Sequence, residues 1–276
     1  MEDALAGLPG ASDEAGDGPL VPALLEAVLL VEGTVASARD ATRAWYADLV
    51  GPLLVPADAT ERVQEQLGPG DVGLRVVLVA RPGPGDPAGL RGMREARHRL
   101  LDDDRVELTG VHIPLPAGQL PADAVADLLA ELDLTVPAWV EVTPSAGWEQ
   151  ALETLAADGA EHLALRLGMP PAAALLRRAV DLDLSLRVSG AGGGAASTVD
   201  LLAALCAVRA ALNGADVPEI AAVLAERRVE RLASALRRMS DADAAVVRAF
   251  LEGVVVPDAE QAARDLAALG LVDPAD

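Results

Sequence analysis

The chain of 276 residues is 51% hydrophobic and only 2% aromatic, which suits one large domain or two small ones with a core of Leu, Val, Ala and Ile. Its formal net charge of −21 argues against nucleic acids and anionic membrane surfaces as partners, because both attract basic patches. All 22 basic residues are arginine and Cys206 is the single cysteine, so the composition excludes Schiff-base catalysis by lysine, intrachain disulfides and cysteine-based zinc sites.

The first segment, residues 1–18, is small and acidic, a composition typical of a disordered tail. It lacks the basic and apolar regions of a signal peptide, and no apolar run in the chain reaches the roughly 18 residues of a membrane span. We therefore expect a cytoplasmic protein. Residues 19–50 carry a helical pattern from Ala23 to Leu49, which predicts an N-terminal helical cap before a single α/β domain over residues 51–276.

After the predicted cap, short apolar segments alternate with helical segments. Strands are predicted at residues 53–56, 74–80, 106–113, 138–143, 162–167 and 184–188, each followed by a helix. A later strand is predicted at residues 250–256, and residues 229–233 carry a weak strand pattern. Strands that are apolar on both faces are typical of a parallel sheet covered by helices, so the pattern favours an α/β fold of the (β/α)8-barrel type, complete or distorted. An open doubly wound parallel sheet is the alternative, although the first strand–helix turn lacks the G-x-G-x-x-G fingerprint.

Polar residues end several predicted strands, at the edge where a barrel binds its ligands. Glu141 and Arg166 lie at matching depths on successive strands. They form either an internal ion pair or, together with Arg187, an anion site in which Glu141 orients the arginines. His112 is a candidate general base, and the alternative is a hydrogen-bonded packing residue. The three histidines are scattered along the chain, and the sequence predicts neither a metal site nor a cofactor.

A glycine-rich loop connects the predicted strand at 184–188 to a predicted helix at 198–212. The candidate ligand-binding residues here are Ser189, Gly190, Gly192, Gly193 and Gly194, whose backbone N–H groups would face a phosphate at the start of the helix. The loop lacks the G-x-x-x-x-G-K-[ST] pattern of a Walker loop. The alternative is a connector in which Ser197 or Thr198 caps the helix.

Two segments of the second half carry a resemblance, Leu165-Arg-Leu-Gly168 and Asp265-Leu-Ala-Ala-Leu-Gly-Leu271. They are similar to a Lys-Leu/Arg-x-Gly strand end and a closing Asp-Leu-x-x-Leu-Gly-Leu motif, and through them residues 138–272 resemble a family of conserved hypothetical proteins of actinomycetes. Where that family has Gly-Leu-His-His, His-Gly-Phe-Leu-Asn and Phe-Gly-Ser-Cys-Ser, this chain has residues 190–193, 196–200 and 250–254, with only Asp200 as a partial match. The resemblance implies a divergent member that keeps the barrel framework without the family's Lys and His positions, and it implies no reaction.

These observations lead to two hypotheses for the function. The first is a non-catalytic, degenerate barrel that serves as a binding or scaffold protein, with a protein partner or a homo-oligomer formed through alanine-rich helices such as residues 203–211. The second is a metal-independent enzyme for a small phosphorylated or carboxylated metabolite, in which Arg166 and Arg187 hold the anion and Glu141 is the acid or base. We favour the first, because lysine, a metal-binding cluster and the family's histidines are missing from the sequence.

Overall fold

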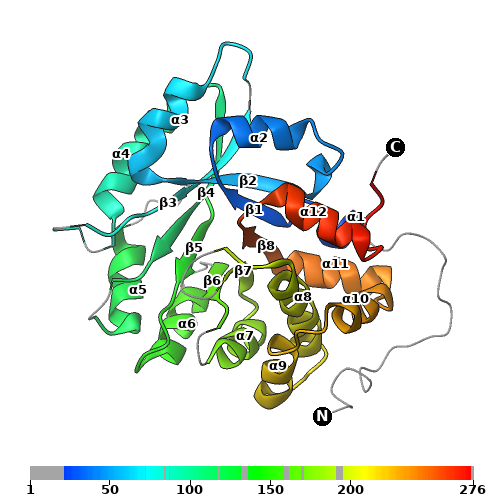
Figure 1. The fold of residues 1–276 in the computed structure, drawn as a ribbon. Coiled ribbons are helices and arrows are strands. Elements are labelled where there is room, and N and C mark those ends of the chain that lie inside the picture. The colour runs from blue at the N-terminus through cyan, green and yellow to red at the C-terminus, as the bar shows by residue number, and fades with distance from the viewer. Residues whose placement is uncertain are drawn as a thin grey trace.

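The computed structural model describes residues 22–71, 73–83, 85–86, 88–116, 119–131, 136–157, 162–168, 171–190 and 195–274 (Figure 1). Eight parallel strands form one closed barrel in chain order, and helices cover its outside. The fold is therefore a (β/α)8 barrel, and the closure of the sheet excludes the open doubly wound alternative. The predicted disordered tail at residues 1–18 lies outside the described residues.

The strands agree closely with the segments predicted from residue 53 onward. They are β1 (Leu29–Glu32), β2 (Val50–Pro56), β3 (Leu74–Val79), β4 (Val106–Pro114), β5 (Ala138–Glu141), β6 (His162–Arg166), β7 (Ser185–Ser189) and β8 (Leu251–Val256). Each strand pairs in parallel with the next, and β8 pairs with β1 to close the barrel. The carboxyl ends of all eight strands therefore meet at one mouth of the barrel.

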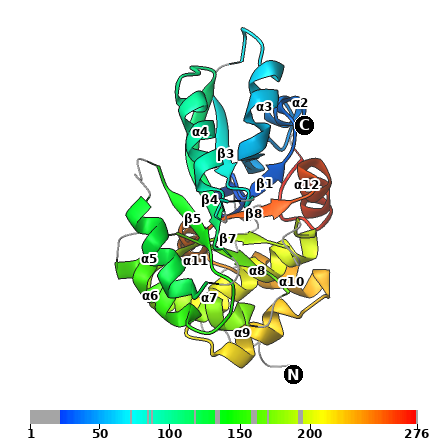
Figure 2. The same ribbon diagram turned by 90° about the vertical axis from the view of Figure 1, so that its left-hand side faces the viewer.

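Helices follow the strands and surround the barrel (Figure 2). They are α1 (Pro22–Leu25), α2 (Val35–Thr42), α3 (Thr60–Gln66), α4 (Leu90–Leu101), α5 (Pro121–Glu131), α6 (Trp148–Ala157), α7 (Ala172–Asp181), α8 (Thr198–Leu212), α9 (Val217–Leu224), α10 (Val229–Arg237), α11 (Asp241–Phe250) and α12 (Ala259–Ala268), with short 3-10 turns at Ala47–Leu49 and Ala57–Ala59. Within the described ranges, none of these helices combines the length and the apolar character needed to cross a membrane.

Side-chain alternation along the strands separates the inside of the barrel from the helical layer. On β7, Leu186 and Val188 belong to the large core that the strands share with the helices. Ser185, Arg187 and Ser189 occupy the opposite, inward parity. The strands are therefore apolar toward the helices, while their inner faces carry many of the polar residues.

The first strand corrects the predicted N-terminal cap. Leu29–Glu32, inside the segment expected to be helical, is β1, and it pairs with both β2 and β8. The helix α1 ends after four residues, and Ala27 then takes a left-handed conformation with φ of 52°. The three apolar residues of this strand are too few to show a periodicity that separates a strand from a helix, which is why the prediction was wrong. The barrel therefore begins before residue 51.

Two further expectations are wrong in the second half of the chain. The weak strand pattern at residues 229–233 belongs to α10, whose Leu232, Ala233, Ala235 and Leu236 are buried at helical spacing. The alanine-rich helix α8 is buried from Leu201 to Ala211, because α9, α10 and α11 pack around it. Residues 203–211 are therefore covered by the chain itself and do not offer a surface for an oligomer.

Candidate functional site

The inner wall of the barrel has an apolar side and a polar side. Leu30, Leu54, Val77, Val79 and Val255 form a small core of their own on β1, β2, β3 and β8. The polar side lies on β4 to β7, together with Glu252 of β8, and divides into two clusters. The upper cluster, near the mouth, comprises His112, Glu141, Arg166 and Ser189; the lower cluster, at the amino ends of the strands, comprises Trp139, His162, Ser185, Arg187 and Glu252.

Glu141 is the centre of the upper cluster. Its side chain is 10% exposed, and one carboxylate oxygen accepts a hydrogen bond from Nη2 of Arg166. The other oxygen lies 3.4 Å from Nε2 of His112. Because a carboxylate only accepts hydrogen bonds, this contact assigns the proton to Nε2 of the imidazole. The ion pair between Glu141 and Arg166 predicted from the sequence is thus present.

The surroundings of Glu141 keep it ionised. Burial alone raises the pKa of its carboxyl, but the hydrogen bond and charge of His112 and the charge and hydrogen bond of Arg166 outweigh burial, so the pKa lies below its ordinary value. A general acid that works near neutral pH needs a raised carboxyl pKa. Glu141 is therefore suited to orienting its two neighbours.

Arg166 and Ser189 lie side by side at the mouth, as register partners on β6 and β7. The Arg166 side chain is 30% exposed, and one of its nitrogens, Nη2, pairs with Glu141. Its Nε has no hydrogen-bond partner among the described residues, and the same holds for the Ser189 hydroxyl. Two neighbouring side chains at the mouth thus retain donors for an acceptor.

The lower cluster is centred on Glu252. Its Oε1 accepts a 2.6 Å hydrogen bond from the Ser185 hydroxyl and lies 2.8 Å from Nδ1 of His162. Burial raises the pKa of the Glu252 carboxyl. The hydrogen bonds from His162 and Ser185 and the charges of His162 and Arg187 lower it by more, so the pKa lies below its ordinary value. His162 is the first residue of β6, so this network lies at the amino-terminal end of the barrel.

Arg187 belongs to the lower cluster, although its backbone is level with that of Glu141. It is 6% exposed, and its guanidinium stacks over the ring of Trp139. Burial lowers the pKa of Arg187 to about 9; the charge of Glu252 raises it, and those of Arg248 and Arg75 lower it. These charged neighbours lie toward the amino ends of the strands. Arg187 and Arg166 therefore face the interior but do not share one anion site.

The glycine-rich loop is only partly described, and Gly192, Gly193 and Gly194 lie outside the described residues. At Gly190 a Cβ atom would lie 2.4 Å from the carbonyl oxygen of Ala195, so close backbone packing explains this glycine. Ser197 caps α8, and the Asp200 carboxylate accepts a hydrogen bond from the backbone N–H of Ser197, which completes a capping box. This capping box is the arrangement that the connector interpretation predicts, and the Asp200 carboxylate also lies 3.3 Å from Nη1 of Arg227.

The sequence located the upper cluster but missed most of the lower one. His112, Glu141, Arg166 and Ser189 come together as neighbours on four successive strands. Ser185, Trp139 and Glu252 were not considered as site residues. The alternation of inward positions along β5 and β7 would have found Trp139 and Ser185, whereas Glu252 on β8 follows from no such pattern.

The described residues contain no group of three or more His, Cys, Asp or Glu side chains arranged to hold a metal ion. Cys206 is buried in α8, and burial raises the pKa of its thiol to about 12, as expected for a packing residue. Comparisons of the chain with models of protein families, with curated proteins and with solved structures gave no match. The class of protein is therefore defined by its fold and geometry, a (β/α)8 barrel with a polar inner wall.

Proposed function

We propose that the protein is a non-catalytic (β/α)8 barrel that binds a small anionic molecule at its mouth through Arg166 and Ser189. The observation that carries the proposal is the pairing of Arg166 with Glu141, which fixes the guanidinium and leaves other N–H groups without a partner in the described structure. Guanidinium and hydroxyl donors together favour a carboxylate or a phosphate as the ligand.

The state of the two interior carboxylates supports binding without catalysis. Glu141 and Glu252 each accept hydrogen bonds from a histidine and a second donor, and each has a lowered pKa. Proton transfer near neutral pH is most efficient from groups whose pKa lies near 7. Neither carboxylate meets that condition, and both are engaged by the chain itself.

The thermal midpoint of the purified protein tests this proposal when it is measured with inorganic phosphate and with succinate at constant ionic strength. A ligand at a hundred times its dissociation constant adds about 2.7 kcal/mol of stability, which raises the midpoint measurably. We expect this rise for the wild type and for Arg178→Ala, a control on α7 whose arginine pairs with Glu153. Arg166→Ala should show no ligand-induced rise above its own midpoint. An equal rise in Arg166→Ala, or none in the wild type, would refute the site.

One observation favours the enzyme hypothesis as an alternative. The hydrogen bond between Nε2 of His112 and Glu141 resembles the pairing that orients an imidazole for general-base catalysis, in which Nδ1 of the neutral ring would be the acceptor. In that case a turnover on a small anionic metabolite would exist and would be abolished by Glu141→Gln. The absence of any such activity across phosphorylated and carboxylated metabolites would leave the binding proposal in place.

We also propose that the chain is a divergent member of the actinomycete family that it resembles. Two glycines of the shared motifs take left-handed conformations, Gly168 with φ of 78° and Gly270 with φ of 64°. Asp265 of the closing motif accepts a 2.6 Å hydrogen bond from the hydroxyl of Thr198 and so ties α12 to the start of α8. These structural roles support a shared framework.

A further inference from the structure

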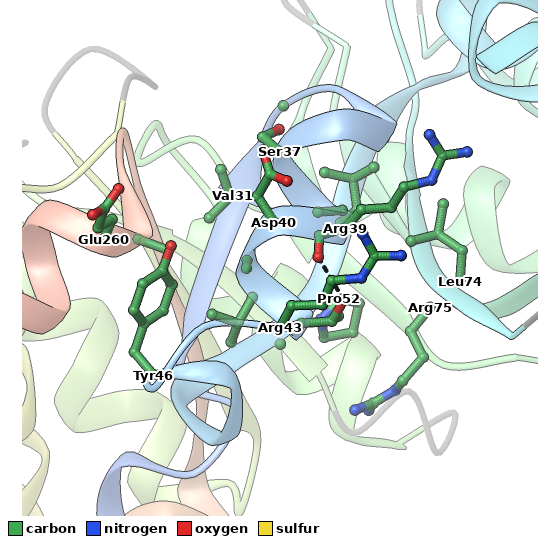
Figure 3. A pocket seen from close by; sticks show the side chains of 18 of the residues that line it. Val31, Ser37, Arg39, Asp40, Arg43, Tyr46, Pro52, Leu74, Arg75 and Glu260 are labelled. Carbon is green, nitrogen blue, oxygen red and sulfur yellow. Dashed lines mark hydrogen bonds between the residues drawn. The ribbon is translucent and has the colours of Figure 1, made fainter. Parts of the chain in front are cut away.

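A cavity lies outside the barrel and shares no residue with the upper or lower cluster. It has a volume of about 680 Å³ and lies between α2, the amino ends of β2 and β3, and the start of α12 (Figure 3). Cavities of roughly 300–1,000 Å³ accommodate ligands of the size of a drug or a short peptide. We call this cavity the α2 cleft.

One end of the α2 cleft is basic. Arg39 on α2 forms a two-armed ion pair with Asp71, with Nε of Arg39 2.6 Å from the carboxylate. Arg43 lies close enough for its charge to lower the pKa of Asp71, and Arg75 on β3 lines the same end. Neither Arg43 nor Arg75 makes a hydrogen bond or ion pair with its side chain in the described part of the chain. Two guanidinium groups there are available to a ligand.

The opposite end is acidic and contains Tyr46. Figure 3 shows Tyr46 and Glu260 on one side of the cleft and Arg75 on the other. Tyr46 is 7% exposed, and its hydroxyl has no hydrogen-bond partner among the described residues. Burial raises the pKa of Tyr46, and the charges of Glu260, Asp258 and Asp40 raise it further. Arg264, which pairs with Glu260, has the opposite effect on this pKa, but the three carboxylates outnumber it around the unpartnered hydroxyl.

Apolar side chains also line the cleft. Figure 3 shows Val31 toward the Tyr46 side and Leu74 beside Arg75, and Pro52 and Leu53 belong to the same lining. An anion alone would be attracted by one end and repelled by the other, and the same is true of a cation. A molecule with both charges and an apolar body between them matches all three parts of the cleft.

We propose that the α2 cleft binds a small zwitterion of the short-peptide class, with its carboxylate at Arg43 and Arg75 and its ammonium group beside Tyr46 and Asp40. The Tyr46 hydroxyl accepts a hydrogen bond from the ammonium group, and the guanidinium groups donate to the carboxylate. The apolar side chain of the peptide packs against the apolar lining of the cleft, such as Pro52. This site is independent of the anion site proposed at the mouth.

Titration calorimetry of the full chain with the tripeptide Ala-Leu-Ala and its end-blocked forms tests the proposal. We expect the free tripeptide to bind, and each blocked end, N-acetyl or C-amide, to weaken binding by about tenfold or more, as expected for the loss of one charge-assisted contact. If the wild type does not bind the free tripeptide, or binds the free and the doubly blocked peptide equally well, the proposed site is wrong.

Variants assign each end of the peptide. Arg75→Ala should bind the free and the C-amidated tripeptide equally, while it still discriminates against the N-acetylated form. Tyr46→Phe with Asp40→Asn should show the opposite selectivity. Arg237→Ala, on the exposed face of α10, is the matched control and should bind as the wild type does. Arg166→Ala should also retain full peptide affinity, so that failure of the mouth site and failure of this site remain distinguishable. Unchanged selectivity in Arg75→Ala would contradict the assigned orientation.

Discussion

The guanidinium carbon of Arg187 lies 3.1 Å from the centre of the Trp139 ring, inside the closed barrel. A cation on the face of an indole is stabilised by about 2 kcal/mol when it is desolvated. Nε and Nη1 of the same guanidinium have no hydrogen-bond partner among the described residues, which costs stability. The arginine is thus held by the ring and by the charge of Glu252, without the full set of hydrogen bonds that a buried cation usually makes.

This balance predicts different outcomes for two substitutions of Arg187. Arg187→Met fills a similar volume without a buried charge and should leave the free energy of unfolding unchanged or raise it. Arg187→Ala removes the same charge but leaves a cavity over Trp139 and should lower stability by about 3 kcal/mol. Urea unfolding followed by tryptophan fluorescence measures both. A large loss in Arg187→Met would mean that the charge itself holds the barrel together.

Gly110 on β4 is required by the packing of Trp139. A Cβ atom at this position would lie 2.1 Å from Cζ3 of the indole. Gly110→Ala should therefore displace the ring and reduce stability by about 1–3 kcal/mol. Gly92→Ala on α4 is the control, because a Cβ there meets nothing within 4 Å, and it should raise stability by up to about 1 kcal/mol. Thermal unfolding of both proteins measures the contrast, and similar midpoints would argue against the close approach of Trp139.

Acid should weaken the barrel through its two interior carboxylates. Glu141 and Glu252 have lower pKa values in the folded protein than the ordinary value of 4.5. Their contribution is complete above the unfolded pKa and is lost as the pH falls through the folded pKa. We therefore expect the free energy of unfolding to fall as the pH drops below about 4.5.

The double variant Glu141→Gln with Glu252→Gln isolates this effect from other carboxyls with lowered pKa values, such as those of Asp71 and Glu226. It should be less stable at neutral pH, by about 1–3 kcal/mol per site, and its stability should depend less on pH below 4.5. If the double variant does not fold, the two single variants provide the same comparison. Parallel pH profiles for the wild type and the variants would show that neither pair contributes.

Ser197 should act on stability and not on anion binding. Its hydroxyl accepts from the backbone N–H of Asp200 and caps α8. Ser197→Ala should cost about 1 kcal/mol, as N-cap substitutions do. Its phosphate-induced rise in thermal midpoint should equal that of the wild type. A loss of phosphate binding in this variant would instead restore the phosphate-cradle interpretation of the glycine-rich loop.

The fold could be predicted from the sequence because periodicity is strongest in long, buried elements. β2 to β8 are apolar on the side that meets the helices, and the helices between them repeat at the expected spacing. β1 was missed because three apolar residues after a one-turn helix fit either pattern. Glu141 and Arg166 could be predicted as neighbours because each ends one of two successive parallel strands; the register pairs Glu141 with Ala164, and the longer Arg166 side chain reaches the carboxylate.

The lower cluster and the α2 cleft could not be predicted in the same way. Glu252 joins His162 and Ser185 only because the barrel closes and β8 pairs with β7 through an irregular register. The direction of the Arg187 side chain is set by Trp139 and by charges on other elements. The cleft combines residues from both ends of the chain, whose proximity follows from the pairing of β1 with β8.

The same pairing determines how the molecule can assemble itself. β1 is the neighbour of β8, so the barrel closes only when the last strand of the sheet pairs with the first. Until then β1 and β8 each expose a row of unpaired backbone groups, which can recruit strands from other molecules. Contacts between such distant segments also slow folding. We expect refolding yield to fall steeply with protein concentration, because a half-closed intermediate can associate before its two ends meet.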